Sequence, residues 1–496
     1  MTLLALPHDL GPFGVEHFGA ARLGDRRRTR SLVDLANRFA KHPGGSLPQK
    51  CRDPNTLRRC YDLMNNPQVS HAAVLQPHSQ HTLQRVYQHR GVVLFLHDAT
   101  ELDLSGHTTL HAELGQIGTG GRLGYLCHNS LAVVPDDQRT VLGLVGQVLH
   151  VRDHVPPDET RKHKRERESR ESLLWLKGVE GVQAATTRCL RRLRWPEHPE
   201  GLRVVDVCDC AADTFEFLWF QQQHQREYVI RSNQNRGIRR GHLDTGPEDL
   251  LHDYLRTLPA RGSRVIQIHA HENQPAREAT VAVAWAAVTL LVPETKNGNY
   301  PNQPLKVWGL RVWETAAPAG VDEPVEWFLL VPVAVTALAD AWRRVDWYVR
   351  RWVVEEFHKA QKTGCDIEGP QFETGAALQP MVALLSVIAV HLLTLRQWSR
   401  DPALAGQAAT EVVEPDFVEV LSAWRWGSVR VLTVREFFLA LARLGGHQNR
   451  QGDKSPGWLV LWRGWESLQS MVEGVRAVRR AARAGKRAKS SLPNSG

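Results

Sequence analysis

The order of apolar and polar positions predicts helices at the start of the chain, then alternating strands and helices, then helices again. Residues 16–45 carry apolar side chains at helical spacing, and two more helical segments follow at 54–66 and 70–88. Together these three segments predict an all-helical N-terminal unit.

Apolar runs of strand length follow this unit, and two of them end on an acidic residue. The runs 91–98 and 202–209 finish at Asp98 and Asp209. Short alternating stretches make residues 235–335 a β-rich block, and a long helix covers about 336–362. This order predicts an α/β domain, whose functional groups we expect at the carboxyl ends of the strands.

These patterns and the length of 496 residues predict three domains. Residues 1–75 form the helical N-terminal domain, and residues 76–398 form the α/β domain with the β-rich block of about 235–335 inserted in it. Residues 399–496 form a helical C-terminal domain, whose basic end from Arg479 onward is expected to be disordered.

Composition predicts where the protein works. No run of eighteen or more apolar residues occurs, so we expect no transmembrane helix and no membrane partner. The start of the chain lacks the basic segment and the cleavage site of a signal peptide. Seven cysteines, an odd number scattered along the chain, favour a reducing compartment. We therefore expect a cytoplasmic protein.

Positive charge is concentrated at the two ends of the chain. The net charge of +9 divides into +7 over residues 1–90, +6 over residues 471–496 and −4 between them. Basic ends suit contacts to phosphate, although solvated basic tails give the same pattern.

Three acidic residues are candidates for chemistry because of their positions. Asp98 and Asp209 close apolar strands, and Glu355 lies in the long predicted helix. Carboxylates from two rigid strands and one helix could hold a pair of Mg²⁺ ions, roughly 3.5–4 Å apart, of the kind that serves phosphodiester chemistry. The alternative for each aspartate taken alone is a turn or cap residue.

The helix that carries Glu355 has a second polar feature. Tyr348, Arg351, Glu355 and Lys362 stand at offsets of 0, 3, 7 and 14 residues, so at about 100° per residue they share a stripe about 60° wide. Such a stripe fits a surface that faces DNA phosphate beside a metal site. A solvated face with ion pairs between neighbouring turns is the alternative.

The same residues resemble a known family. The spacing Y-x2-R-x3-E-x6-K that begins at Tyr348 is similar to the signature of bacterial cut-and-paste transposases of the insertion-sequence-four group. The segments around Asp98 and Asp209 resemble the two Asp motifs of that family, and residues 23–29 resemble its end-binding helix. The similarity runs from about residue 16 to 398.

The resemblance implies a fold and a set of metal ligands. The central domain would have an RNase H-like fold, with the β-rich block inserted before the Glu355 helix. Asp98, Asp209 and Glu355 would bind divalent metal, as two Mg²⁺ ions for which Mn²⁺ can substitute. Cys210 and Ala211 stand where the family usually has Arg-Glu, a departure that affects local DNA contacts and removes no metal ligand.

The resemblance also implies contacts to DNA. The side chains that would contact phosphate are Tyr348, Arg351, Lys362 and Arg231. Trp327 would receive a flipped-out base, with a core tryptophan as the alternative. The candidates for recognition of the element ends are Arg27, Arg28 and Arg30. Neutralisation of phosphate without base readout is the alternative for these three.

A reaction and its partners follow from the family. Metal-activated water would cut one strand at the element's end, and the freed 3′-OH would close a DNA hairpin on the opposite strand. Hydrolysis of the hairpin would release the element, whose 3′-OH ends then attack target DNA. The expected partners are double-stranded DNA, as inverted-repeat ends and target, and a second copy of the chain in a homodimer on paired ends. The expected setting is the nucleoid in a bacterial cytoplasm.

Two other functions remain open from the sequence. A domesticated or inhibitory DNA-binding protein with the same fold would bind DNA without cutting it, and an RNase H-like nuclease would act on DNA junctions. The first is expected to have lost an acid, whereas Asp98, Asp209 and Glu355 are all present. The second leaves the N-terminal helices without a role. Both points favour the transposase.

Overall fold

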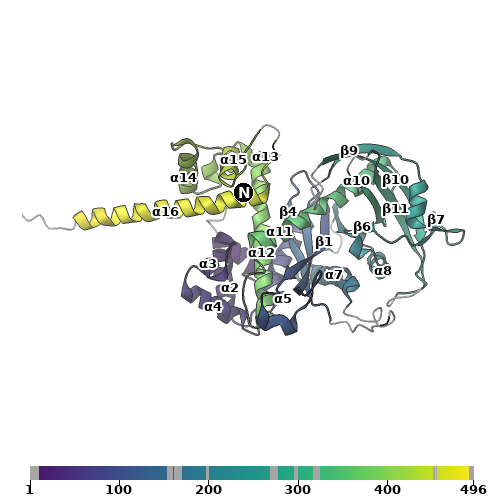
Figure 1. Cartoon of the computed structure of the whole chain (residues 1–496), viewed down its shortest axis with the longest axis horizontal. Coiled ribbons are helices and arrows are strands. Elements are labelled where there is room, and N and C mark those ends of the chain that lie inside the picture. Colours follow the sequence, from purple (N-terminus) through teal and green to yellow (C-terminus); the bar gives the residue numbers. More distant parts are fainter. Residues whose placement is uncertain are drawn as a thin grey trace, which may run out of the picture. The chain divides into compact units, whose positions relative to one another are not determined.

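The computed structural model is a mixed α/β structure with a helical N-terminal region and a mixed sheet (Figure 1). It describes residues 11–153, 160, 170–196, 200–268, 277–294, 300–316, 324–450, 453 and 455–490, without the side chains of residues 11, 12 and 483–490. Two compact units divide the chain. Unit 1 comprises Met1–Pro77, Phe357–Gln371 and Ala376–Gly496, and unit 2 comprises His78–Glu356 and Phe372–Gly375.

This division groups the chain differently from the three consecutive domains predicted above, because unit 1 takes segments from both ends of the sequence. Its N-terminal helices are α1 (Gly11–Phe18), α2 (Arg26–Lys41), α3 (Leu47–Cys51), α4 (Pro54–Met64) and the start of α5 (His71–Gln88). Its later helices are α12 (Gly375–Arg400), α13 (Pro402–Ala405), α14 (Pro415–Trp426), α15 (Val434–Leu444) and α16 (Trp458–Ser490). The predicted helices at 54–66 and 70–88 are therefore confirmed as α4 and α5.

The predicted helix at 16–45 is in fact two helices, because the chain leaves helical geometry after Phe18 and re-enters it at Arg26. Asp25 caps the second helix: its carboxylate accepts a hydrogen bond from the backbone N–H of Arg27 at 2.8 Å. A carboxylate at this position satisfies a backbone donor that has no partner within the helix. The apolar spacing itself is confirmed, since Leu32 and Phe39 of α2 are completely buried.

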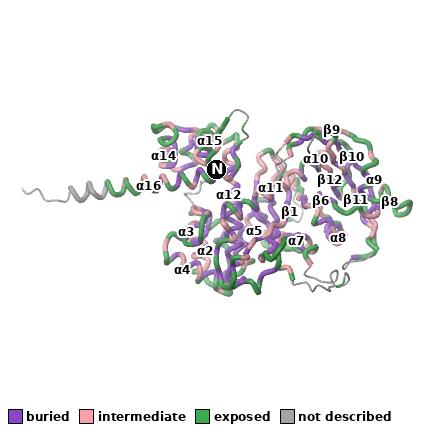
Figure 2. Tube along the Cα trace, in the orientation of Figure 1, coloured by how far each residue is buried: buried purple, intermediate pink, exposed green. Residues whose placement is uncertain are grey.

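Helix α12 is long and apolar enough to cross a membrane by length and composition alone, although the sequence predicts no transmembrane helix. Of its most apolar window, 83% is buried inside the protein. A core helix passes the same test, and α12 is buried on nearly every side (Figure 2). A helix that is hydrophobic all round is expected in such a position.

Helix α16 continues to Ser490, although the sequence analysis expected disorder from Arg479. Arg479 is tied to α14, where its guanidinium contacts Asp416 and Glu419. Alanine and arginine, which dominate this stretch, have high helix propensity, so the segment can remain helical despite its charge. Residues 491–496 lie outside the described part of the chain.

Unit 2 is built on one mixed sheet. Its strands are β1 (Gly91–Asp103), β2 (Gly115–Gln116), β3 (Leu123–Val133), β4 (Val141–His150), β5 (Leu202–Cys208), β6 (Glu227–Ser232), β7 (Gly237–Arg240), β8 (Glu248–Leu250), β9 (Gly262–Ile268), β10 (Arg277–Leu290), β11 (Leu305–Glu314) and β12 (Glu326–Val331). They run in the order β2-β3-β1-β5-β6-β12-β11-β10-β7-β8, with β4 paired to β3 and β9 to β10. Strands β1, β5 and β6 are parallel, and all other pairs are antiparallel.

The β-rich block predicted at about 235–335 corresponds to strands β7 to β12 together with α9 (Leu251–Thr257). Strand β12 pairs with β6, so the block extends the central sheet and does not form a separate layer. Its outer part, around β8 and β9, is mostly exposed (Figure 2).

Helices cover both faces of the central strands. Helices α7 (Leu174–Leu193) and α8 (Phe215–Gln223) pack on one face, where Val182 and Cys189 of α7 join a core cluster with Phe95 of β1. Helix α10 (Leu338–Arg350) packs on the other face, where Arg344 lies 3.6 Å from Glu227 of β6. The α10 face is the one that carries the acidic residues considered below.

The buried His78 gives unit 2 a testable pH dependence. Its Nε2 accepts a hydrogen bond from the backbone N–H of Leu144 at 3.0 Å, which holds the ring neutral. Burial lowers the pKa of His78 to about 3. A histidine whose folded pKa lies below its unfolded value of about 6.5 stabilises the fold fully above that pH, and the contribution is lost as the pH falls. We expect this residue alone to reduce the free energy of unfolding by about 3 kcal/mol between pH 7 and pH 4.

The variant His78→Gln tests this expectation, because its amide oxygen can accept the same hydrogen bond but takes up no proton. Urea unfolding measured from pH 7 to pH 4 should show a shallower loss of stability in the variant than in the wild type. Parallel losses in the two proteins would contradict the assignment.

Candidate active site and DNA-binding region

Strand pairing brings four polar residues into one row across unit 2. Asp98 of β1 lies opposite Asn129 of β3. The parallel ladder between β1 and β5 ends at His97 and Cys208, so Asp98 and Asp209 follow as the next residues on the two strands. The ladder between β5 and β6 ends at Cys208 and Ile230, which places Arg231 next to Asp209. Neighbouring strands are about 4.8 Å apart, so side chains in such a row are close together.

Asp98 does not end its strand, so the predicted strand boundary at this residue is wrong. Strand β1 continues to Asp103, and those last residues pair with β3 alone. What ends at His97 is the parallel pairing with β5. The predicted site at the carboxyl ends of the strands therefore lies where β1 stops pairing with β5 and continues to pair with β3 alone.

Arg351 joins two of the three predicted acids. This residue lies between α10 and α11 (Trp352–Lys359), and its Nη1 donates to Asp98 Oδ2. Its Nη2 donates to Glu355 Oε1 at 2.9 Å. One guanidinium group therefore spans the carboxylates of Asp98 and Glu355.

The acids form a local concentration of negative charge. Burial raises the pKa of Asp98, with the Arg351 guanidinium acting against that rise. The pKa of Asp209 is raised to about 6 by burial and then by the negative charge of Asp98. Like charges in a desolvated place disfavour ionisation of both groups. A cation at this point would relieve that repulsion, which Arg351 does in part.

Tyr348, Trp327 and Arg231 also come together in unit 2. Tyr348 is buried, and the positive charge of Arg231 acts on its hydroxyl. Burial raises the pKa of Tyr348, and Arg351 and Arg231 oppose the rise. The half-buried Trp327 packs edge-to-face on Tyr348, with ring centroids 5.3 Å apart. The structure thus brings three predicted DNA contacts together beside the acids.

Lys362 does not lie on the regular helix that the sequence analysis assumed. The helix is interrupted at Arg351, and residues Ala360–Gly364 form a π-helical turn. A π-helical turn holds more residues than an α-helical one and so rotates by less than 100° per residue, which means that the angle calculated for Lys362 does not apply. Lys362 belongs to unit 1, where its Nζ lies 3.7 Å from Glu368 Oε1.

Asp213 is an important residue whose role the sequence analysis did not assign. Its side chain is fully buried and contacts Arg236. Its Oδ2 accepts hydrogen bonds from the Ser232 hydroxyl at 2.9 Å and from the backbone N–H groups of Asn233 and Gln234 at 2.9 and 3.0 Å. The carboxylate therefore fixes the turn that follows Arg231. The available sequence signal was a second acid four residues after Asp209.

The basic start of α2 lies in unit 1, and its arginines differ in availability. The side chain of Arg27 is 90% exposed, and Arg30 is exposed as well. Arg28 is engaged, because its Nη1 donates to the backbone oxygen of Leu23 at 2.8 Å. Arg27 and Arg30 are therefore the better placed of the three to contact a ligand.

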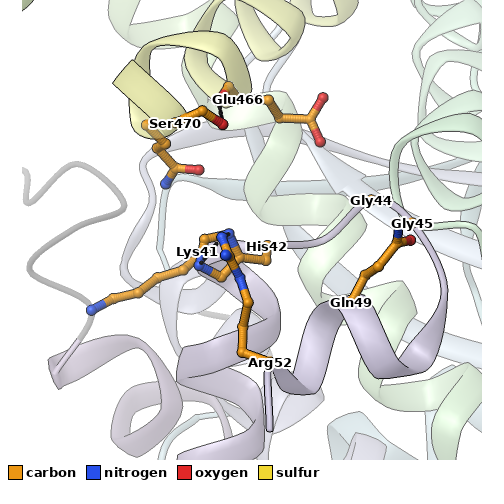
Figure 3. Close-up of a pocket in the computed structure, with 9 residues that line it drawn as sticks. Lys41, His42, Gly44, Gly45, Gln49, Arg52, Glu466 and Ser470 are labelled. Atoms are coloured by element: carbon orange, nitrogen blue, oxygen red, sulfur yellow. Dashed lines mark hydrogen bonds between the residues drawn. The ribbon is translucent and has the colours of Figure 1, made fainter. Parts of the chain in front are cut away.

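A polar pocket of about 340 Å³ lies at the other end of α2, also within unit 1 (Figure 3). Its lining residues are Lys41, His42, Gly44, Gly45, Gln49, Arg52, Glu466, Gln469 and Ser470. Arg52 Nη2 lies 3.1 Å from His42 Nδ1, and burial followed by the charge of Arg52 lowers the pKa of His42. Burial raises the pKa of Glu466. The pocket joins the N-terminal helices to α16.

The compact N-terminal helices can be compared with known domains. Residues 13–69 match the family described as transposase DNA-binding. This DNA-binding domain covers α2, α3 and α4 and includes all three candidate arginines. The match supports DNA as a partner of this chain, and the matched domain is of the kind that a DNA-binding transposase carries.

Arg27 of the DNA-binding domain gives a direct test. We expect Arg27→Ala to weaken binding to the element's ends and to reduce the salt slope of the affinity by about 1, as loss of one phosphate contact would. The control variant is Arg435→Ala. Arg435, like Arg27, is an exposed arginine in the first turn of a helix, here α15. Titrations of labelled end DNA at several salt concentrations measure both quantities. An unchanged slope in Arg27→Ala would remove the residue from the interface.

Proposed function

We propose that this chain is a cut-and-paste DNA transposase of the insertion-sequence-four group, with Asp98, Asp209 and Glu355 as its catalytic acids. One observation carries the proposal: Asp98 follows the β1–β5 ladder beside Asp209, and Arg351 joins Asp98 to Glu355. The charges of all three acids, which are far apart in sequence, therefore act on one guanidinium group, that of Arg351. The DNA-binding domain at residues 13–69 supplies a reason for DNA to be the substrate.

The order of the central strands supports an RNase H-like core. Strand β1 has the antiparallel β3 on one side and the parallel β5 and β6 on the other, and β4 lies beyond β3. This five-stranded arrangement, with acids on the first and fourth strands in chain order, is compatible with such a core. The strands β7 to β12 would be the insertion before the helix of Glu355.

The donor set suits hard divalent cations. Asp98, Asp209 and Glu355 offer carboxylate oxygen, which Mg²⁺ prefers. Burial raises the pKa of both aspartates, and the charge of Asp98 adds to the rise for Asp209, so a cation would stabilise their ionised forms. When bound, two Mg²⁺ ions, or Mn²⁺ in their place, would activate the attacking oxygen and stabilise the leaving oxygen. Arg351 contacts two of these carboxylates, so we expect it to shift toward DNA phosphate when the ions bind.

The remaining work falls to side chains of this chain. The proposed phosphate contacts are Tyr348, Arg351, Arg231 and Lys362, and Trp327 is the proposed acceptor for a flipped base. Such contacts would hold the strand end while the 3′-OH attacks the opposite strand and closes a hairpin. No covalent bond to the enzyme is required, because water and DNA hydroxyls are the only nucleophiles. Positioning of the reacting groups and stabilisation of charge in the transition state would accelerate the reaction.

The partners and location follow from this chemistry. Both ends of an element must be joined, so we propose a homodimer on paired inverted-repeat ends, with target DNA bound at the joining step. The C-terminal helices α14, α15 and α16 are the proposed dimer surface. A protein that acts on the chromosome would work in the bacterial cytoplasm at the nucleoid.

The test uses the full-length protein, Mg²⁺ and a plasmid that carries the inverted repeats flanking the gene. We expect cleavage at the repeat ends that depends on Mg²⁺, with hairpin-ended fragments visible on denaturing gels. Binding of the ends without any cleavage would instead indicate an inhibitory DNA-binding protein. Cleavage without preference for the repeats would indicate a nuclease of another kind.

A further inference from the structure

A buried polar network lies behind the carboxylate row, on the opposite face of the sheet. His97 Nε2 lies 3.0 Å from Asp206 Oδ1, and Arg226 donates to the two Asp206 oxygens at 2.7 and 2.6 Å. The side chains of His97 and Asp206 are 0% and 1% exposed. Successive residues of a strand point to opposite faces, so His97 lies behind its neighbour Asp98. The proposed chemistry uses none of these three side chains.

The network connects several elements at this level of the sheet. The Ser130 hydroxyl of β3 lies 2.9 Å from His97 Nδ1. Because His97 Nε2 faces the Asp206 carboxylate, which only accepts, a neutral ring carries its proton on Nε2 and accepts from Ser130 at Nδ1. Arg226, which precedes β6, donates from Nη1 to Gln183 of α7 at 2.6 Å. Burial would raise the pKa of Asp206, but Arg226 beside it holds that pKa below its usual range. The carboxylate is therefore an ionised group whose position depends on several partners at once.

Burying a charge between two strands costs desolvation free energy. A well-packed apolar cluster of similar volume stabilises a core as well or better. What such a cluster lacks is direction, because hydrogen bonds to an ionised carboxylate fix distances and angles. A polar network in this place therefore points to a need for precise geometry.

The backbone pairing around Asp98 and Asp209 shows where precise geometry is needed. The described ladder between β1 and β5 goes no further than His97 and Cys208, and Asp98 and Asp209 come immediately after it. In the part of the chain that the structure describes, Asp98 and Asp209 are therefore not partners in the β1–β5 ladder. The contact from His97 to Asp206 links β1 and β5 by side chains one residue before Asp98 and three residues before Asp209.

We propose that His97 is a positioning residue that acts through Asp206 and Arg226 to fix the spacing of Asp98 and Asp209 at which a divalent cation binds. This inference rests on the proposed function. It assigns His97 no contact with the ion or with DNA. Residues that orient metal ligands typically change metal affinity by about 10–100-fold when replaced.

The test measures Mn²⁺ binding to the full-length protein, without DNA, by electron paramagnetic resonance of the free ion. His97→Leu removes both hydrogen bonds of the ring, and we expect it to weaken Mn²⁺ binding by about tenfold. His97→Gln can still accept from Ser130 and donate to Asp206, so we expect it to recover most of the affinity. Rescue by glutamine would not follow from a role in packing alone.

The matched control is His78→Leu, which removes another buried histidine of unit 2 whose ring accepts a hydrogen bond from Leu144. We expect this control to lower thermal stability while Mn²⁺ affinity stays within about twofold of the wild type. Should His97→Leu fail to fold, Ser130→Ala replaces it. That variant removes only the hydroxyl that orients the His97 ring, and we expect about a threefold loss of Mn²⁺ affinity, below the usual range for direct partners of a ligand.

The outcomes separate the inference from the proposed function. If the wild type binds no Mn²⁺, or if Asp209→Asn binds it as tightly as the wild type, the metal site itself is refuted and the inference falls with it. If the wild type binds Mn²⁺ and folded His97→Leu, or Ser130→Ala in its place, binds it equally well, only the positioning role is overturned. Weaker binding in His97→Leu with recovery in His97→Gln supports it.

Discussion

Replacing Glu355 by alanine is expected to reduce cleavage at the element's ends by on the order of a thousandfold or more. A metal ligand at a phosphoryl site supplies several kcal/mol of transition-state stabilisation, and about 4 kcal/mol corresponds to a factor of about a thousand. The fold should survive, because the Arg351–Glu355 pair is a partly exposed contact between neighbouring helical turns. Such pairs contribute under about 1 kcal/mol. Plasmid cleavage in Mg²⁺ measures the rate, and end binding should remain close to the wild-type value.

The neighbouring acid provides the control. Glu356 follows Glu355 in α11, but the two side chains are about 100° apart around the helix. Glu356→Ala should therefore keep most of the cleavage activity. Equal rates for the wild type and Glu355→Ala would remove Glu355 from the mechanism, and equal losses in both variants would point to a general effect on the helix.

Replacing Asp213 by alanine is expected to destabilise unit 2 by about 3–5 kcal/mol, since it leaves a buried cation and several buried donors without their acceptor. The Asp213 carboxylate is fully buried against Arg236, whose side chain is 9% exposed. Removal also frees the Ser232 hydroxyl and the backbone N–H groups after it. Urea unfolding followed by tryptophan fluorescence measures the loss.

A surface pair in the same unit serves for comparison. Asp244, whose side chain is 82% exposed, lies 2.9 Å from Lys306. Because exposed pairs contribute little, Asp244→Ala should change the free energy of unfolding by less than about 1 kcal/mol. A loss as small as this in Asp213→Ala would mean that the network around Asp213 is not needed to hold the turn.

Local patterns in the sequence predicted most of the elements of this fold. Apolar spacing located α4 and α5, and it located β5 because that strand is a short apolar run bounded by turns. The break between α1 and α2 is not predicted, because the segment from Gly19 to Asp25 leaves helical geometry and caps α2 without changing the apolar pattern around it. The interruption at Arg351 and the π-turn at Ala360–Gly364 were missed for a related reason: no glycine or proline marks their start.

The candidate site was only partly predictable. The identities of Asp98, Asp209 and Glu355 came from position and family resemblance, but their proximity depends on pairing between strands about a hundred residues apart, which no local pattern encodes. The contacts from Arg351 to Asp98 and Glu355 could not be predicted either, because its position on the helix suggested a contact to DNA and not to the acids. The buried cluster around Asp206 gave no signal, since an acid within an apolar run looks the same whether it is satisfied or not.

The row of polar residues across β3, β1, β5 and β6 has a consequence for how this protein can vary. Side chains alternate along a strand, so the face on which a group lies depends on whether the count of residues before it is odd or even. Deleting a single residue from β5 would leave all three acids in the polypeptide but turn Asp209 toward the α7 side. Homologous proteins with this activity should therefore tolerate insertions of any length in the loops around β5. Within β5 itself they should not tolerate insertions or deletions of an odd number of residues.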